Sequence, residues 1–181
     1  MRCTPETPSG AALKFALASA AAWLILVALA GCAASRLESG HPLISGGPDE
    51  ETAHVYFIRP RTERYLGVAD NALTIEADRS PLLELAKGEY ALVALKPGSV
   101  WLTVRSDTSW GPAHDIKEMS TTREFTFTAG QTYFVALTAV DGEFRGVTYH
   151  ADAIDLDQAR QLSANLRPAG ASARATPISI L

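Results

Sequence analysis

Cysteine is scarce in this chain of 181 residues, which contains only Cys3 and Cys32. Small secreted domains that depend on disulfides usually carry about four or more cysteines at regular spacings. Because both cysteines lie within the first 32 residues, no disulfide can form inside the rest of the chain. An apolar core must therefore hold the fold together.

Positive charge is also scarce. The chain has 16 lysines and arginines against 20 aspartates and glutamates, which gives a formal net charge of −4. The basic residues form no patch that would replace the counterions of a phosphate backbone. We therefore expect no nucleic-acid partner.

Sequence signatures of catalysis and of metal binding are missing. No pair of histidines has the spacing of metal ligands; the four are His41, His54, His114 and His150. We interpret them as surface or edge residues, and a site assembled from distant strands is the alternative. No serine lies in a G-x-S-x-G turn, and Gly46-Gly47 follows no strand that would make a phosphate-binding loop. The sequence predicts no enzyme, no metal and no cofactor.

Long hydrophobic runs are absent apart from one near the amino terminus. Residues 15–30 are apolar except for Ser19, and Arg2 and Lys14 precede them. The run is shorter than the roughly 20 residues that a membrane-spanning helix needs. Its length, its flanking charge and its position are typical of a signal peptide.

The run ends in Leu29-Ala30-Gly31-Cys32, which resembles the lipobox of bacterial lipoproteins. The resemblance implies that the Cys32 thiol receives diacylglycerol, that residues 1–31 are removed, and that the new amino terminus is acylated with a chain such as palmitate. Several acyl chains together hold a protein firmly on a membrane. Two alternatives are an ordinary secretory cleavage and an uncleaved anchor in which Cys32 has no role.

The chain after residue 31 divides into three predicted parts. Residues 32–52 are rich in glycine, serine, proline and acidic residues, which predicts a lipidated, flexible tether. Residues 53–166 form the folded domain, and residues 167–181 are expected to be a loose C-terminal tail. The 150 residues left after cleavage carry a net charge near −5, because the removed segment holds two basic side chains and one acidic. They are enough for one domain with its own core.

No aspartate follows Cys32 directly. In lipoproteins of enteric type, which this segment resembles, that pattern implies the outer membrane rather than the inner membrane. We expect the protein on the periplasmic face of the outer membrane.

Short strand patterns dominate residues 54–149. Buried and exposed positions alternate most clearly in residues 100–105, and Asp141-Gly142 is the strongest hairpin signal. The strand spacing and the lack of a helix among the strands predict a mainly β fold, an antiparallel β-sandwich of about seven to eight strands. One C-terminal helix is predicted over residues 156–166, with Asp155 as its N-cap.

A series of motifs resembles one known family. The motifs are Val55-Tyr56-Phe57-Ile58-Arg59-Pro60, Leu85-Ala86-Lys87-Gly88-Glu89-Tyr90, Lys96-Pro97-Gly98 and Ala129-Gly130-Gln131-Thr132-Tyr133-Phe134. In this order, over about residues 53–165, they resemble the domain of unknown function 2846 family, which consists largely of bacterial lipoproteins with a β-rich domain. The chain departs from the family at Asp78-Arg79, where Asp-Gly is usual, and at Val100, where a histidine is frequent. The resemblance supplies no catalytic residues.

Two stretches are candidates for contact with a partner. Trp110 and His114 lie in residues 106–120, which we expect to be an irregular loop of a length that is uncommon unless it binds something or lacks order. Trp110 has the alternative role of a lid over the end of the core. Arg59, Arg61 and Arg64 form a basic cluster suited to a lipid head group or a glycan acid, unless it is only a solvated loop.

Two classes of function remain compatible with the sequence. The first is a lipid-anchored binding or scaffolding module that contacts another envelope protein through a sheet edge or the Trp110 segment. The second is an envelope hydrolase or glycan-acting enzyme whose site is assembled only in the fold. The first is our prediction, because no motif of the chain states a chemistry.

The lipid anchor makes a direct prediction for Cys32→Ala. Only the thiol accepts the diacylglyceryl group, so the variant should remain an unprocessed or mis-sorted precursor without lipid. Labelling of cells with a radioactive fatty acid measures this. Equal label in the variant and in the wild type would rule out the lipoprotein interpretation.

Overall fold

The computed structural model of the protein describes residues 41–44, 51–61, 72–111, 113–141 and 146–181. All of them belong to one compact unit, Ala34–Leu181. The expected signal peptide and Cys32 lie outside the described residues, so both stay predictions.

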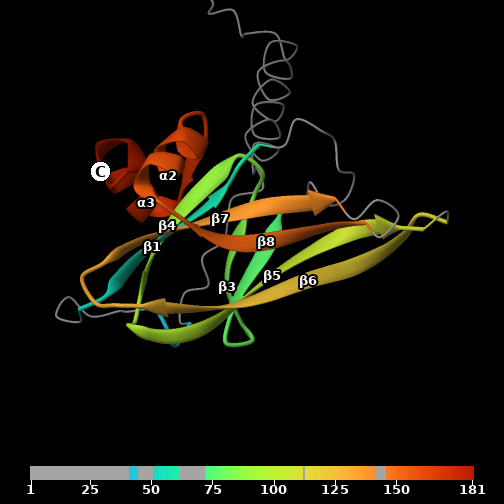
Figure 1. The fold of residues 1–181 in the computed structure, drawn as a ribbon, viewed down its shortest axis with the longest axis horizontal. Coiled ribbons are helices and arrows are strands. Elements are labelled where there is room, and N and C mark those ends of the chain that lie inside the picture. Colours follow the sequence, from blue (N-terminus) through green and yellow to red (C-terminus); the bar gives the residue numbers. More distant parts are fainter. Residues whose placement is uncertain (1–40, 45–50, 62–71, 112, 142–145) are drawn as a thin grey trace, which may run out of the picture. The chain divides into compact units, whose positions relative to one another are not determined.

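The described residues form a mainly β structure of two sheets and short C-terminal helices (Figure 1). The strands are β1 (Ala53–Arg59), β2 (Leu73–Ala77), β3 (Ser80–Leu85), β4 (Glu89–Leu95), β5 (Gly98–Trp110), β6 (Asp115–Phe127), β7 (Thr132–Asp141), β8 (Val147–Ile154) and β9 (Arg167–Ala169). The helices are α2 (Leu156–Ser163), α3 (Gly170–Ala175) and the 3-10 helix η3 (Ile178–Ile180). The expected β class is confirmed.

The two sheets differ in their strand directions. The four-stranded sheet has the order β3-β2-β5-β6 and is antiparallel throughout, whereas the five-stranded sheet has the order β8-β7-β1-β4-β9. In the five-stranded sheet β1 runs parallel to β7, and β9 runs parallel to β4. The prediction of a wholly antiparallel fold is therefore wrong. Tight hairpins force neighbouring strands to be antiparallel, but strands β2 to β6 lie between β1 and β7 in the chain, so no hairpin sets the direction of this pair.

The main core lies between the two sheets. Alternate residues of β1, β4, β7 and β8 point from the five-stranded sheet toward alternate residues of β2, β3, β5 and β6, and together they form one buried apolar cluster. Phe57, Ile75 and Leu102 are completely buried in it. Because side chains alternate between the faces of a strand, the remaining positions point outward from each sheet.

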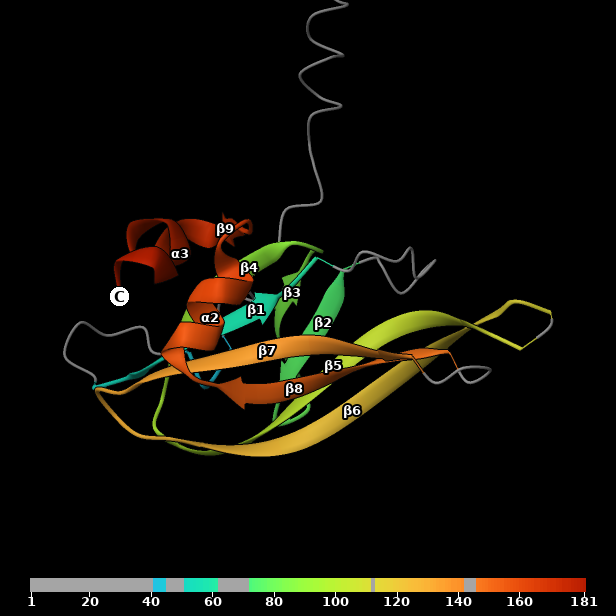
Figure 2. The same ribbon diagram turned by 45° about the horizontal axis from the view of Figure 1, so that its top comes forward.

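The outer face of the five-stranded sheet is covered by the C-terminal segment (Figure 2). Tyr56, Tyr90 and Phe134 project from that face and pack against Ala159 of α2 and Ile178 of η3 in a second buried cluster. The Tyr56 and Phe134 rings stack with their centroids 5.4 Å apart. The part of this face that carries Tyr56, Tyr90 and Phe134 is therefore buried in the protein.

Helix α2 begins where the sequence predicts it. The Asp155 side chain accepts a hydrogen bond of 2.7 Å from the Gln158 backbone N–H, and the Gln158 side chain accepts one of 3.3 Å from the Asp155 N–H. This reciprocal capping box satisfies two N–H groups that the first turn leaves unpaired.

Among the described residues, no helix has both the length and the apolar character needed to cross a bilayer.

Residues 167–181 are not the loose tail that we expected. Strand β9 extends the sheet beside β4, and Ile178 is completely buried. The Tyr56 hydroxyl also donates a hydrogen bond of 2.9 Å to the Thr176 carbonyl. Main-chain pairing and one well-placed isoleucine order the segment, and neither produces a periodic pattern in the sequence.

Part of the expected tether is packed on the domain. His41 is buried, its Nε2 lies 3.2 Å from the Ala77 carbonyl oxygen, and its Nδ1 accepts a hydrogen bond of 3.1 Å from the Leu43 N–H. Ile44 forms a β-bridge with Leu95 of β4. Residues 41–44 thus link β2 of one sheet to β4 of the other at the end of the core. The expectation that His41 is a surface residue is wrong for this reason.

The packing of the C-terminal segment predicts an alkaline limit to stability. Burial raises the pKa of the Tyr56 phenol above its ordinary value of 10.0, and Tyr90 nearby adds to the shift. Burial likewise raises the pKa of Tyr90, with a hydrogen bond from the Ile178 backbone acting against it. Both phenols stay neutral in the folded state while the unfolded chain ionises, so the stabilisation is complete below about pH 10 and is lost as pH rises further.

Urea denaturation between about pH 9 and 12 tests this prediction. The free energy of unfolding should fall above about pH 10, and the double variant Tyr56→Phe/Tyr90→Phe should show a shallower fall. At neutral pH the same variant should be less stable by about 1 kcal/mol or more, because the Thr176 carbonyl loses its partner. Identical pH dependence in both proteins would contradict the assignment.

Candidate binding groove

Residues 106–110 and 115–120 are strand residues rather than parts of the irregular loop that we expected over residues 106–120. Strands β5 and β6 pair over their whole length in one long hairpin, which turns between Trp110 and Asp115. Gly111 and His114 both have positive φ, at 66° and 55°, which allows the tight reversal. The sequence of β6 shows no strand periodicity, because most of its side chains before Phe125 are exposed and no apolar face alternates with a polar one.

Two of the predicted contact residues, Trp110 and His114, lie at the tip of this hairpin. His114 is exposed at the turn, and its Nδ1 lies 3.3 Å from the Ser109 hydroxyl. The backbone of Trp110 is the last of β5, but its side chain lies outside what the structure describes. Both proposed roles of Trp110, lid and contact residue, therefore stay predictions.

Arg59 and Arg61 of the predicted arginine cluster do not lie together on the surface. Arg59 is 1% exposed, and its Nη1 donates a hydrogen bond of 2.8 Å to the Leu85 carbonyl. Its guanidinium carbon lies 5.3 Å from the centre of the Tyr149 ring, within range of a cation–π contact. Arg59 therefore joins β1 to β3 and β8 inside the protein, and its prediction as a partner contact is wrong. Arg61 is exposed, and Arg64 lies outside the described residues.

A groove of about 700 Å³ lies on the outer face of the four-stranded sheet. Its floor comes from outward-pointing residues of three adjacent strands. They are Glu76 of β2, Trp101, Thr103 and Arg105 of β5, and Ser120 and Thr122 of β6. The strand register explains the grouping, because Thr103 is paired with both Glu76 and Thr122 and Arg105 is paired with Ser120. We call this feature the outer groove.

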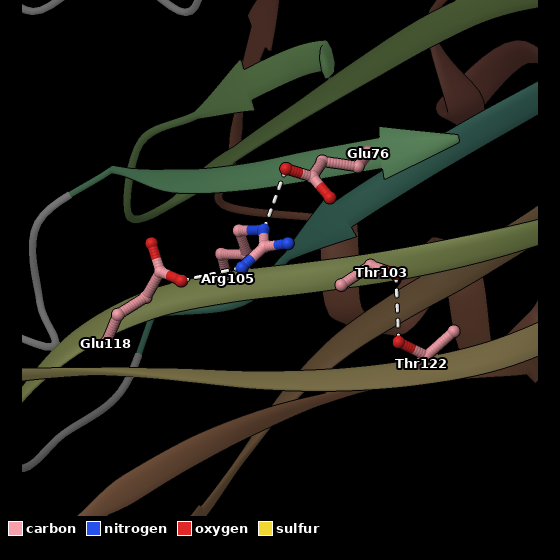
Figure 3. A network of polar contacts seen from close by, with 5 residues as sticks. All are labelled: Glu76, Thr103, Arg105, Glu118 and Thr122. Carbon is pink, nitrogen blue, oxygen red and sulfur yellow. Dashed lines mark hydrogen bonds and ion pairs between the residues drawn. The ribbon is translucent and has the colours of Figure 1, made fainter. Parts of the chain in front are cut away.

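Arg105 holds the three strands together across the outer groove (Figure 3). Its Nε donates to Glu76 Oε1 at 2.7 Å, and its Nη1 donates to Glu118 Oε1 at 2.6 Å. These two hydrogen bonds, with Glu76 contributing most, raise the pKa of the Arg105 guanidinium above its ordinary high value. The arginine is therefore charged at every accessible pH, and its charge is shared between two carboxylates.

Hydroxyl groups occupy the middle of the outer groove. Thr103 is buried to 8% exposure, and its Oγ1 lies 2.9 Å from that of Thr122, also drawn in Figure 3. Either threonine can donate to the other, and each keeps further capacity to donate or accept. This part of the groove therefore offers weak, neutral hydrogen-bonding groups beside the charged network.

The β2–β3 turn closes one end of the outer groove and carries Asp78 and Arg79. Both have positive φ, at 49° and 69°, as a type I′ hairpin turn requires. The Asp78 N–H donates to the Trp101 carbonyl at 3.0 Å, and Asp78 Oδ1 accepts from the Trp101 N–H at 3.0 Å. The backbone of Trp101 is thus fixed, while the residue as a whole is 53% exposed beside the groove.

A smaller hollow of about 160 Å³ lies where β6 meets β8, beside His150. Arg123 Nη1 donates to Asp152 Oδ1 at 2.6 Å there, and the Thr121 hydroxyl donates to the Tyr149 carbonyl. These contacts link one sheet to the other. In the part of the chain that the structure describes, no three histidine, cysteine, aspartate or glutamate side chains are grouped as a metal ion requires.

Comparison with family models, with curated proteins and with solved structures finds no match to this chain. The family resemblance of the motifs therefore stays a prediction.

The unequal exposure of the two carboxylates predicts unequal contributions to stability. The Glu76 side chain is 13% exposed and that of Glu118 is 57% exposed. Glu76→Gln should lower the free energy of unfolding by about 1 kcal/mol, because a charged hydrogen bond is lost in a partly desolvated place. Glu118→Gln serves as the matched control and should cost less than about 0.5 kcal/mol, as exposed ion pairs usually do. Urea denaturation of both variants gives the comparison, and the reverse ranking would show that the network is organised differently.

Proposed function

We propose that this protein is a lipoprotein of the cell envelope, held on the outer membrane by lipid on Cys32, whose β-sandwich domain is a non-catalytic binding module. The outer groove is its binding site. We choose this surface because the outer faces of the two sheets are covered to different extents. The C-terminal helices bury the part of the outer face of the five-stranded sheet around Tyr56, Tyr90 and Phe134, whereas within the described residues no helix residue lines the outer groove. The groove also exposes Trp101, a residue type enriched where proteins bind partners.

The state of the carboxylates favours binding over catalysis. A glycan-cleaving enzyme needs one carboxyl group to donate a proton and a second to act as nucleophile or base. Glu76 and Glu118 both accept hydrogen bonds from Arg105 instead, so each is already engaged in holding the sheet. The alternative is an envelope hydrolase or glycan-acting enzyme, which would have to release one of them from Arg105.

The packed part of the tether shortens the stretch of chain between the domain and the proposed anchor. Because residues 41–44 are bound to the domain, only nine peptide units separate Cys32 from His41. Such a segment spans at most about 30 Å when fully extended, at roughly 3.3–3.6 Å per residue. His41 contacts Ala77, which precedes the groove residue Asp78. The proposed ligand is therefore a component of the envelope near the membrane rather than one deep in the periplasm.

Photo-crosslinking in living cells tests the binding site. A photoreactive amino acid replaces Ser120 or Thr122, which are exposed groove residues, in the otherwise complete lipoprotein. The matched control carries it at Gln161, an exposed position of α2 on the covered side. We expect adducts from the two groove positions and none from Gln161.

Adducts that form equally at Gln161, or at neither groove position, would refute the outer groove as the binding site. The enzyme alternative has its own readout, which is the release of new reducing ends from envelope glycans by the purified protein. If the wild type releases reducing ends and a folded Glu76→Gln variant does not, the protein is a hydrolase rather than a binding module.

A further inference from the structure

We propose that the ligand of the outer groove is an uncharged oligosaccharide, which stacks on Trp101 and hydrogen-bonds to the network around Arg105. This inference rests on the proposed function and names the class of ligand. The charge of the outer groove, its hydrogen-bonding groups and its length all favour such a ligand.

The charges of the residues that line the outer groove cancel. Glu76 and Asp78 balance Arg79 and Arg105, and Glu118, which pairs with Arg105 from outside the lining, adds one negative charge. Arg105 is already paired with two carboxylates, so it is a poor partner for an anionic head group or phosphate, whose affinity depends mainly on bidentate pairing with arginine. A strongly cationic ligand would meet two arginine side chains. The electrostatics therefore favour a neutral ligand.

The hydrogen-bonding groups suit hydroxyls in particular. Arg105 has five N–H donors, two of which go to the carboxylates, and each carboxylate has a second oxygen that accepts. A sugar hydroxyl donates and accepts at the same time, so neighbouring hydroxyls can accept from a guanidinium N–H and donate to a carboxylate oxygen. Thr103, Thr122 and Ser120 extend the same kind of groups across the floor.

Trp101 supplies the apolar part of the site. Trp101 is 53% exposed, so part of a large apolar side chain lies in contact with water. The negative face of an aromatic ring attracts polarised C–H groups, which a pyranose ring presents on one side. Trp101 and Arg105 are four residues apart on β5, so about 13 Å of strand separates them. That distance matches a short chain of sugar rings better than a single ring.

A peptide strand is a poorer occupant of the outer groove. Added strands bind to a free sheet edge, where main-chain groups are unpaired. The groove instead lies over β5, whose main chain is paired with β2 on one side and with β6 on the other. A ligand in the groove is therefore recognised by side chains alone, which is how a saccharide is held.

Isothermal titration of the detergent-solubilised, full lipoprotein tests the proposal. The probes are neutral tetrasaccharides of β-linked glucose, α-linked glucose and β-linked N-acetylglucosamine, together with vesicles of anionic phospholipid. We expect at least one neutral tetrasaccharide to bind and the vesicles to show no binding that depends on the groove. Trp101→Ala should weaken saccharide binding about tenfold or more, since tryptophans dominate the interfaces in which they stack.

Ile116→Ala is the matched control, because Ile116 is 66% exposed on the same hairpin but does not line the outer groove. It should bind as the wild type does. Three results would overturn the proposal: no neutral saccharide binds, Trp101→Ala binds as tightly as the wild type, or only the anionic vesicles bind. If any of these results is obtained while crosslinks still form from Ser120 and Thr122 in cells, the saccharide proposal is refuted and the binding-module proposal is retained.

Discussion

The burial of apolar side chains between two sheets is the constraint on which the rest of the structure depends, and a polar contact closes each end of that core. Arg59 reaches from β1 of the five-stranded sheet to the Leu85 carbonyl of the four-stranded sheet. At the other end of β1, residues 41–44 join Ala77 to Leu95, again from one sheet to the other. A buried polar group is tolerated only when its hydrogen bonds are made, so these contacts also fix how the sheets face each other.

This arrangement makes the two outer faces unequal. Tyr56 and Tyr90 place aromatic surface on the outside of the five-stranded sheet, and the C-terminal segment must cover it. The four-stranded sheet carries threonines, glutamates and arginines on its outside and needs no cover, because its polar groups pair with one another across the strands. Among the described residues, no helix residue lines the outer groove, and the network that shapes the groove joins three strands of the sheet.

Sequence patterns identified the parts of the fold that touch the core. The alternation in residues 100–105 predicted the facing of β5 correctly, and Asp155 predicted the start of α2. The same reasoning failed for β6, where Ser120 and Thr122 lie in a stretch exposed on nearly every side chain. Without those two residues the polar side of β5 resembles an ordinary solvated face, so the groove was not predicted. A period of two is visible in a sequence only where one face is apolar.

The sequence by itself determined the class of the fold, the positions of most strands, and the amino-terminal pattern on which the lipid anchor is predicted. Each of these depends on local composition and on short-range periodicity. Only the tertiary structure decided that Arg59 and His41 are buried, that residues 167–181 are packed, and that β1 runs parallel to β7. Those outcomes depend on which distant segments meet, since a polar side chain can be buried only where the fold provides its partner. The grouping of Glu76, Arg105 and Glu118 from three strands has the same origin.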